Sequence, residues 1–123
     1  MSDPVDIAKR AFRAYVDDDR AAIEALVAED FRFTSPYDNG IDRQTYFARC
    51  WPNHEAMAKV DFVRALCCDD EVALTYEATM LTGRVVRNTE LFTIRDGLIV
   101  AVEVYFGWNV PHDAEPGGFL DPG

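Results

Sequence analysis

Hydrophobic and polar residues alternate along the second half of the chain, which is the pattern of half-buried β-strands. The alternating runs predict strands over residues 60–68, 71–82, 85–95 and 98–108. Short polar connections separate the runs, at Asp69-Asp70, Thr82-Gly83-Arg84 and Arg95-Asp96-Gly97. Because such short connections join antiparallel neighbours, we expect an antiparallel meander.

The first half of the chain has the spacing of helices. Asp3 followed by Pro4 is a helix start, since aspartate caps the end and proline suits the first helical position. The apolar positions of this helix recur at helical spacing and are Val5, Ala8, Phe12 and Tyr15, with Ile7, Ala11 and Val16 beside them. Asp19 can cap a second, short helix that carries Ile23, Leu26 and Val27. These two helices are expected to form a hairpin.

A short strand and a third helix are predicted next. Phe31 and Phe33 alternate with polar residues, and Ser35-Pro36 ends this strand before the turn-rich loop over 37–40. Asp42 can cap the third helix, which carries Tyr46, Phe47, Cys50 and Trp51 at helical spacing. Pro52 should end it near Trp51, and residues 53–58 can add one more turn.

Helices followed by an antiparallel meander predict an α+β fold with the helices on one face of the sheet. A strongly curved sheet wrapped about the N-terminal helices makes a cone, and a cone leaves a cavity between sheet and helices. We expect a single domain over residues 1–110, without internal repeats, and a Pro/Gly-rich extended tail over residues 111–123.

The last predicted hairpin places one carboxylate, Glu90, on an apolar face. A two-residue loop at Asp96-Gly97 would set Glu90 opposite Glu103, and like charges across a strand pair destabilise a sheet. A three-residue loop, Arg95-Asp96-Gly97 with a left-handed Gly97, avoids this and is our prediction. It groups Glu90 with Phe92, Ile94, Leu98, Val100, Val102, Val104 and Phe106. The opposite face then holds Thr89, Leu91, Thr93, Ile99, Ala101, Glu103 and Tyr105.

The register of the preceding hairpin has two solutions. A two-residue turn with Gly83 first places Glu77 opposite Glu90. The alternative register faces Tyr76 toward Glu90, with Leu74, Ala78 and Met80 along the wall. Which of Glu77 and Tyr76 faces the cavity remains open.

The amino-acid composition limits the kinds of partner, compartment and metal site that we expect. The chain carries 12 basic and 22 acidic residues, a formal net charge of −10, which repels nucleic acids and anionic membranes. It contains neither an apolar leader nor a run of about 18 apolar residues, so we expect a cytoplasmic protein. Its three cysteines show no CxxC spacing, and we interpret them as buried apolar residues without a metal site. We expect neither cofactor nor metal.

The run from Asn88 to Trp108, NTELFTIRDGLIVAVEVYFGW, supported by GIDRQTYFARCWPN at 40–53, resembles the SnoaL-like and ketosteroid-isomerase-like branch of the nuclear-transport-factor-two superfamily. This resemblance implies the cone-shaped, cystatin-like α+β barrel over about residues 3–110, and homodimers through the outer sheet face. In the ketosteroid isomerase pattern a helix-one tyrosine and a strand acid form the oxyanion hole, and Tyr15 and Glu90 look similar to these two groups. The family's general base is an aspartate before a proline, where this chain has Ser35 before Pro36. This departure argues against Δ5-type steroid isomerisation.

The candidate catalytic residues are Glu90, Tyr15 and Asp38. A glutamate among apolar neighbours has a raised pKa and can act as an acid or base near neutral pH, and Asp38 is expected in the loop at the cavity mouth. The candidate ligand-binding residues are Glu77, Trp51, His54, Phe92, Val104, Phe106 and Trp108. The predicted ligand is a small, largely apolar molecule, processed by cofactor-independent acid–base chemistry as in an isomerase, cyclase, dehydratase or hydrolase. The alternative is a non-catalytic ligand-binding or dimerisation domain, and the apolar outer sheet face predicts a homodimer in either case.

Overall fold

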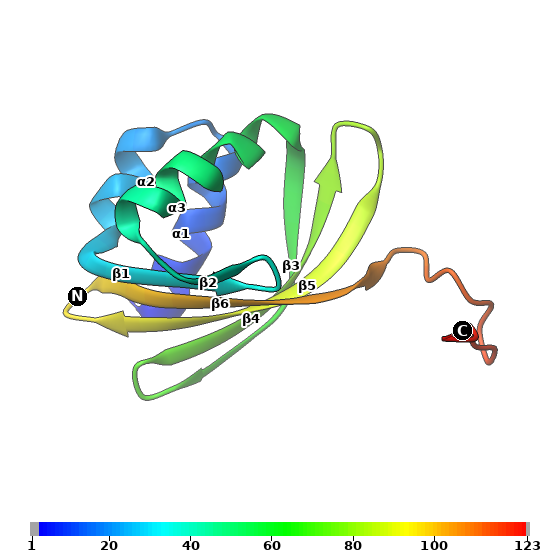
Figure 1. The fold of residues 1–123 in the computed structure, drawn as a ribbon. Helices are drawn as coiled ribbons and strands as arrows, with labels where there is room; N and C mark the ends of the chain where they lie inside the picture. Colours follow the sequence, from blue (N-terminus) through cyan, green and yellow to red (C-terminus); the bar gives the residue numbers. More distant parts are fainter. Residues whose placement is uncertain (1–2, 123) are drawn as a thin grey trace.

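The computed structural model describes residues 3–122 and shows helices packed on the concave face of one curved sheet (Figure 1). The helices are α1 (Pro4–Val16), α2 (Arg20–Leu26), α3 (Arg43–Arg49) and the 3-10 helix η1 (Trp51–Ala56). The strands are β1 (Val27–Ser35), β2 (Asp38–Asp42), β3 (Met57–Cys68), β4 (Glu71–Met80), β5 (Val85–Arg95) and β6 (Leu98–Asn109). This is the predicted α+β cone, and residues 111–122 form an extended tail that points away from its body.

The three predicted helix starts are confirmed. The side chain of Asp3 accepts a hydrogen bond from the Val5 N–H at 3.1 Å, with Pro4 in the first turn. Asp19 and Asp42 cap α2 and α3 in the same way. Each cap satisfies a backbone donor that has no partner inside its helix, which fixes where the helix begins.

The sheet has the strand order β2-β1-β6-β5-β4-β3 and is larger than the predicted meander. The segment 38–42, predicted largely as loop, is strand β2 and pairs antiparallel with β1. Val27 begins β1 instead of extending the second helix, and β1 pairs parallel with β6. The prediction missed this pair because a parallel neighbour far away in the chain leaves no turn signal in the sequence.

The loop of the β5–β6 hairpin differs from the prediction. Asp96 and Gly97, both with positive φ, form a two-residue turn, and Arg95 pairs with Leu98. A bulge at Val100 then shifts the register, so that Glu90 lies opposite Val104 and Glu103 lies opposite Leu91. The bulge thereby separates the two carboxylates, which was the reason for preferring a longer loop. It also turns Ile99 into the core, with 1% of its surface exposed, and leaves Leu98 36% exposed, the reverse of the prediction.

A second bulge lies at Gly107 of β6. Asn88 pairs with Phe106 and Arg87 pairs with Trp108, so Gly107 has no partner across the strand pair. A Cβ atom at Gly107 would collide with the carbonyl oxygen of Arg87, which only glycine avoids. Because the bulge inverts the alternation, Phe106 borders the inner face while Trp108 lies beside Arg87 on the outer face.

The structure resolves the open register of the β4–β5 hairpin. The connection spans four residues, Leu81–Arg84, so the two-residue turn, one of the two alternatives, does not form, and Thr79 pairs with Val85. Leu74 consequently lies opposite Glu90, Tyr76 lies on the inner face, and Glu77 points outward to form an ion pair with Arg87.

The core fills the space between α1 and the inner sheet face. Phe12 is its centre, with ring contacts to Phe62, Tyr76 and Phe92 at centroid distances of 5.8, 4.5 and 5.9 Å. Cys50 is buried as predicted, but Cys67 and Cys68 are exposed because β3 is an edge strand. None of the helices within residues 3–122 combines the length and the hydrophobicity needed to cross a membrane.

Candidate functional site

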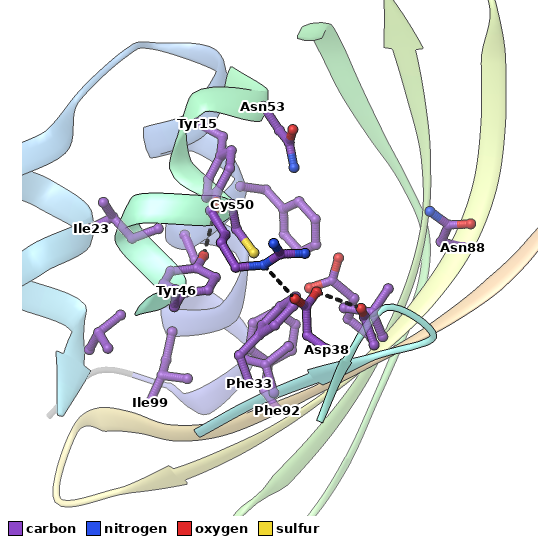
Figure 2. A pocket seen from close by; sticks show the side chains of 18 of the residues that line it. Tyr15, Ile23, Phe33, Asp38, Tyr46, Cys50, Asn53, Asn88, Phe92 and Ile99 are labelled. Atoms are coloured by element: carbon purple, nitrogen blue, oxygen red, sulfur yellow. Dashed lines mark hydrogen bonds and ion pairs between the residues drawn. The ribbon is translucent and has the colours of Figure 1, made fainter. Parts of the chain in front are cut away.

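A cavity of about 490 Å³ lies between α1, α3 and the inner face of the sheet (Figure 2). Its floor is apolar and consists of buried residues that include Ile23, Phe31 and Ile99. Its mouth is marked by lining residues that are exposed, namely Tyr37, Arg49, Asn53 and Phe106. The remaining polar groups in the wall are Tyr15, Ser35, Asp38, Tyr46, Tyr76, Asn88 and Glu90. A mostly apolar hollow with a few convergent polar groups is typical of small-molecule sites.

Glu90 is the acidic group of the cavity wall that lies on β5. Its Oε2 accepts a hydrogen bond of 2.6 Å from the hydroxyl of Tyr76. Burial raises the pKa of Glu90 from 4.5 to about 7, because the charged form loses hydration, while the hydrogen bond from Tyr76 opposes this rise. The carboxyl group is therefore poised to gain or lose a proton near neutral pH.

A chain of hydrogen bonds leads from the Gly107 bulge to Glu90. The N–H of Gly107 donates to Oδ1 of Asn88 at 3.1 Å, and Nδ2 of Asn88 faces the hydroxyl oxygen of Tyr76 at 3.3 Å. A backbone N–H can only donate, so the Asn88 amide must present its oxygen to Gly107 and its nitrogen to Tyr76. The Tyr76 oxygen thus accepts from Asn88, and its proton is directed to Glu90.

Two further phenols form a pair in the wall. The hydroxyl oxygens of Tyr15 and Tyr46 lie 2.7 Å apart. Burial raises the pKa of both phenols, and the charge of Glu90 raises them further, so they stay protonated at neutral pH. Only one proton can lie between the two oxygens, so the second remains available to another acceptor. The Cys50 thiol beside them also stays neutral, since burial raises its pKa to about 11.

Asp38 lies at the cavity mouth, at the start of β2. Its Oδ2 accepts from the Ser35 hydroxyl at 2.8 Å and its Oδ1 accepts from Nε of Arg49 at 2.9 Å (Figure 2). The side chain of Asp38 is only 9% exposed, whereas that of Arg49 is 57% exposed. Both carboxylate oxygens of Asp38 are therefore engaged by neighbouring residues.

The structure brings together six of the ten residues that we selected from the sequence. Glu90, Tyr15, Asp38, Phe92, Val104 and Phe106 all line the cavity.

The other four selected residues lie outside the cavity lining. Trp51 packs behind Tyr15, and His54 stacks on Trp51 while its Nδ1 lies 3.4 Å from Asp18. Glu77 is paired with Arg87 on the outer face, where Trp108 also lies. The bulge at Gly107 accounts for the outward position of Trp108, and the four-residue β4–β5 loop accounts for that of Glu77.

Sequence reasoning missed Asn88 and Arg49, and it identified Tyr46 only as one of the regularly spaced positions of the third helix. A signal for Arg49 was present, because Tyr46, Arg49, Cys50 and Asn53 follow the i, i+3, i+4, i+7 spacing of one helix face and all four line the cavity. Asn88 gave no such signal, since its role depends on the bulge opposite. Within residues 3–122, no cluster of His, Cys, Asp or Glu side chains could hold a metal ion.

Comparisons with known proteins place the chain among cone-shaped folds. A family model described as "SnoaL-like domain" matches residues 8–102. No curated protein matches the sequence.

Several solved structures share the fold. A protein from Kribbella flavida DSM 17836, described as a proposed ketosteroid isomerase, superposes with a TM-score of 0.74 at 18% identity, covering 98% of this chain and 83% of that one. An LEH-like epoxide hydrolase from M. tuberculosis superposes with a TM-score of 0.71 at 15% identity, covering 85% of this chain and 82% of that one. IdmH from Streptomyces antibioticus, described as a proposed polyketide cyclase, superposes with a TM-score of 0.69 at 20% identity, covering 84% of this chain and 91% of that one. At these identities the likeness concerns the fold.

Proposed function

The chain belongs to the SnoaL-like domain family, and on that premise we propose that it is a cofactor-independent acid–base catalyst acting on a small, largely apolar molecule. Glu90 is the proton-transfer group. The observation that carries the proposal is a carboxyl group in the wall of an apolar cavity, with a pKa of about 7 and a hydrogen bond from Tyr76. A pKa close to the working pH is the best compromise for a group that must both take and return a proton.

The hydrogen-bond chain favours Glu90 as a base. Asn88 directs the Tyr76 proton toward Oε2 of Glu90, which stabilises the carboxylate form. Among the described residues, 3–122, none donates a hydrogen bond to the other oxygen, Oε1, which is therefore available to take a proton from a bound molecule. After the proton moves, the neutral carboxylic acid can return it at a different atom, which is the requirement of an isomerisation or a cyclisation.

Tyr15 supplies the complementary donor. Tyr15 and Tyr46 both line the cavity, and Tyr15 is the more exposed of the two. If Tyr46 donates to the Tyr15 oxygen, the Tyr15 proton is free to bind an oxygen of the ligand. When Glu90 removes a proton next to a carbonyl group, the electron pair moves to that oxygen, and the Tyr15 hydroxyl stabilises the developing charge.

Asp38 has a supporting role in this proposal, because both of its oxygens already accept hydrogen bonds from Ser35 and Arg49. The structural neighbours described as an isomerase, an epoxide hydrolase and a polyketide cyclase are consistent with acid–base chemistry, since each of these reactions moves protons.

The test is proton exchange at carbon. The protein is incubated with a panel of apolar ketones in deuterated buffer, and the loss of α-proton NMR signals is followed. Wild type should accelerate the exchange of at least one ketone, and Glu90→Gln should abolish this while the ketone's affinity changes by no more than a few-fold. Binding of ketones without exchange would contradict catalysis and favour the alternative, a ligand-binding domain.

We also propose a homodimer through the outer sheet face. Leu91, Ala101 and the 55%-exposed Tyr105 lie on this face, although Ile99, which was expected beside them, is buried in the core. Adjacent apolar side chains on a sheet surface favour association.

A further inference from the structure

We propose that the ligand is an amphipathic carboxylic acid, whose carboxylate binds Arg49 at the cavity mouth while its apolar body extends inward to Glu90. This inference deepens the proposed function, because it names the class of molecule that the site accepts. It makes Arg49 the residue that determines specificity.

Of the residues that the structure describes, Arg49 is the sole basic one that lines this cavity. Asp38 engages its Nε at 2.9 Å, and within residues 3–122 neither terminal amino group of Arg49 donates a hydrogen bond. A guanidinium group offers two donors side by side along that remaining edge, and their spacing matches the two oxygens of a carboxylate. The free edge of Arg49 is therefore a preformed pair of donors for a carboxylate.

The position of Arg49 is fixed before a ligand arrives. Asp38 is 9% exposed and is itself held by the Ser35 hydroxyl, whose oxygen accepts from the Tyr37 N–H at 3.0 Å. A side chain held in this way loses less freedom on binding than a mobile one. Asp38 thus acts as the anchor that aims Arg49 at the mouth.

Charge sets the orientation of the ligand. The inner wall is apolar and contains Glu90, so a carboxylate placed there would lose its hydration and face a second acidic group. At the mouth the carboxylate keeps contact with water and gains Arg49, which attracts it as well as the neighbouring Asp38, and the amide of Asn53 on η1 also lines the cavity. The acid therefore binds with its head at the mouth and its apolar carbon atoms beside Glu90 and Tyr15.

The test compares 4-phenylbutyrate with its methyl ester, two probes that share the apolar body and differ in charge. Affinities are measured by calorimetry and by NMR titration on wild type, Arg49→Gln, Arg49→Lys and Arg13→Gln. Arg13 is an exposed residue of α1 beside Asp6, so its substitution changes the net charge equally but leaves the cavity intact. NMR spectra of the free variants check that each retains the fold.

Wild type and Arg13→Gln should bind the acid at least about tenfold more tightly than the ester, since charge-assisted hydrogen bonds are worth more than neutral ones. Arg49→Gln should remove this preference while leaving ester affinity within about threefold. Arg49→Lys should keep only part of the preference, because lysine retains the positive charge but cannot bind bidentately. Equal affinity of wild type for acid and ester, an equal loss of both in Arg49→Gln, or no binding of either probe would overturn the inference. These outcomes concern binding alone, so they are independent of the proton-exchange test that decides the proposed function.

Discussion

Glu90 is the residue at which the proposed function opposes stability. A glutamate has a pKa near 4.5 in the unfolded chain, and burial raises it to about 7 in the folded protein. Between these values the folded state keeps a proton that the unfolded state has lost. The contribution of Glu90 to the free energy of unfolding is therefore most favourable below pH 4.5 and falls as the pH rises from 4.5 to about 7. Above about pH 7 it no longer changes with pH.

The first prediction follows from this linkage. Glu90→Gln removes the titrating group and keeps an oxygen that can accept from Tyr76. The free energy of unfolding of the variant should therefore increase relative to that of wild type as the pH rises. The difference in the free energy of unfolding, variant minus wild type, should increase by about 2 kcal/mol between about pH 5 and pH 8. Urea unfolding at the two pH values measures it, and a difference that does not change with pH would be inconsistent with a desolvated Glu90.

The second prediction concerns the direction of the hydrogen-bond chain. Asn88→Asp keeps the shape of the side chain and its bond from the Gly107 N–H, but it cannot donate to Tyr76. The Tyr76 proton then has a competing acceptor and the site gains a negative charge, so the pKa of Glu90 should rise by at least about one unit. Tyr76→Phe should also raise the pKa of Glu90, because it removes the donor that stabilises the carboxylate.

The matched control for this prediction is Asn109→Asp. Asn109 lies at the end of β6, where it contacts Arg84 and Asp113, and it does not line the cavity. NMR titration of Glu90 should show little change in this variant. If Asn88→Asp leaves the pKa of Glu90 where it is in wild type, Asn88 does not position Tyr76.

At the scale of elements, the two bulges of β6 decide which side chains reach the cavity. The bulge at Val100 turns Ile99 inward, and the bulge at Gly107 turns Trp108 outward. Alternation alone predicted the opposite for both residues, because a strict period of two has no place for an extra residue. It nevertheless placed Glu90, Phe92 and Val104 on the correct face. Val104 lies between the two bulges of β6, and Glu90 and Phe92 on β5 pair with that same stretch.

The third prediction tests the Gly107 bulge. Gly107→Ala should reduce the free energy of unfolding by roughly 2–4 kcal/mol, because its Cβ meets the backbone carbonyl of Arg87 and the strands must separate. Gly97→Ala is the matched control. Gly97 has a φ of 78° and nothing within 4 Å of a Cβ, so only backbone strain of about 1 kcal/mol is expected there. Urea unfolding compares the two variants, and equal losses would mean that the bulge tolerates a side chain.

The helices were the elements that sequence reasoning located best. Their starts depend on local chemistry, namely an aspartate whose side chain reaches a backbone N–H within three residues. Strand β2 and the β1–β6 pair depend on distant partners instead, and no local signal reports them. The same distinction holds for the candidate site, where Glu90 was visible as a charge in an apolar run but Asn88 was not.

At the scale of the whole molecule, the curved sheet and the helices form a cone that opens at the tip of the β1–β2 hairpin and the end of α3 (Figure 1, Figure 2). Strand β6 contributes to both ends of the cavity, with Ile99 at the floor and Phe106 at the mouth. Sequence reasoning selected Asp38 and Phe106 at the mouth, whereas Arg49 emerged only from the folded structure.

The fourth prediction concerns assembly. If the outer sheet face forms a homodimer, analytical ultracentrifugation at micromolar concentration should give twice the monomer mass, and Leu91→Glu should yield monomers, because a charge would be buried at the interface. Leu81→Glu places the same charge in the exposed β4–β5 loop and should leave the dimer intact. A monomeric wild type, or a dimer that Leu91→Glu does not affect, would rule out this interface.

The most direct measurement is the titration of the Glu90 side-chain carboxyl carbon by NMR in the ligand-free protein, with Glu90→Gln used to assign the signal. We expect a midpoint at about pH 7, together with a matching change at the Tyr76 hydroxyl, which donates to Glu90. A midpoint near 4.5, the ordinary value for a hydrated glutamate, would contradict this expectation.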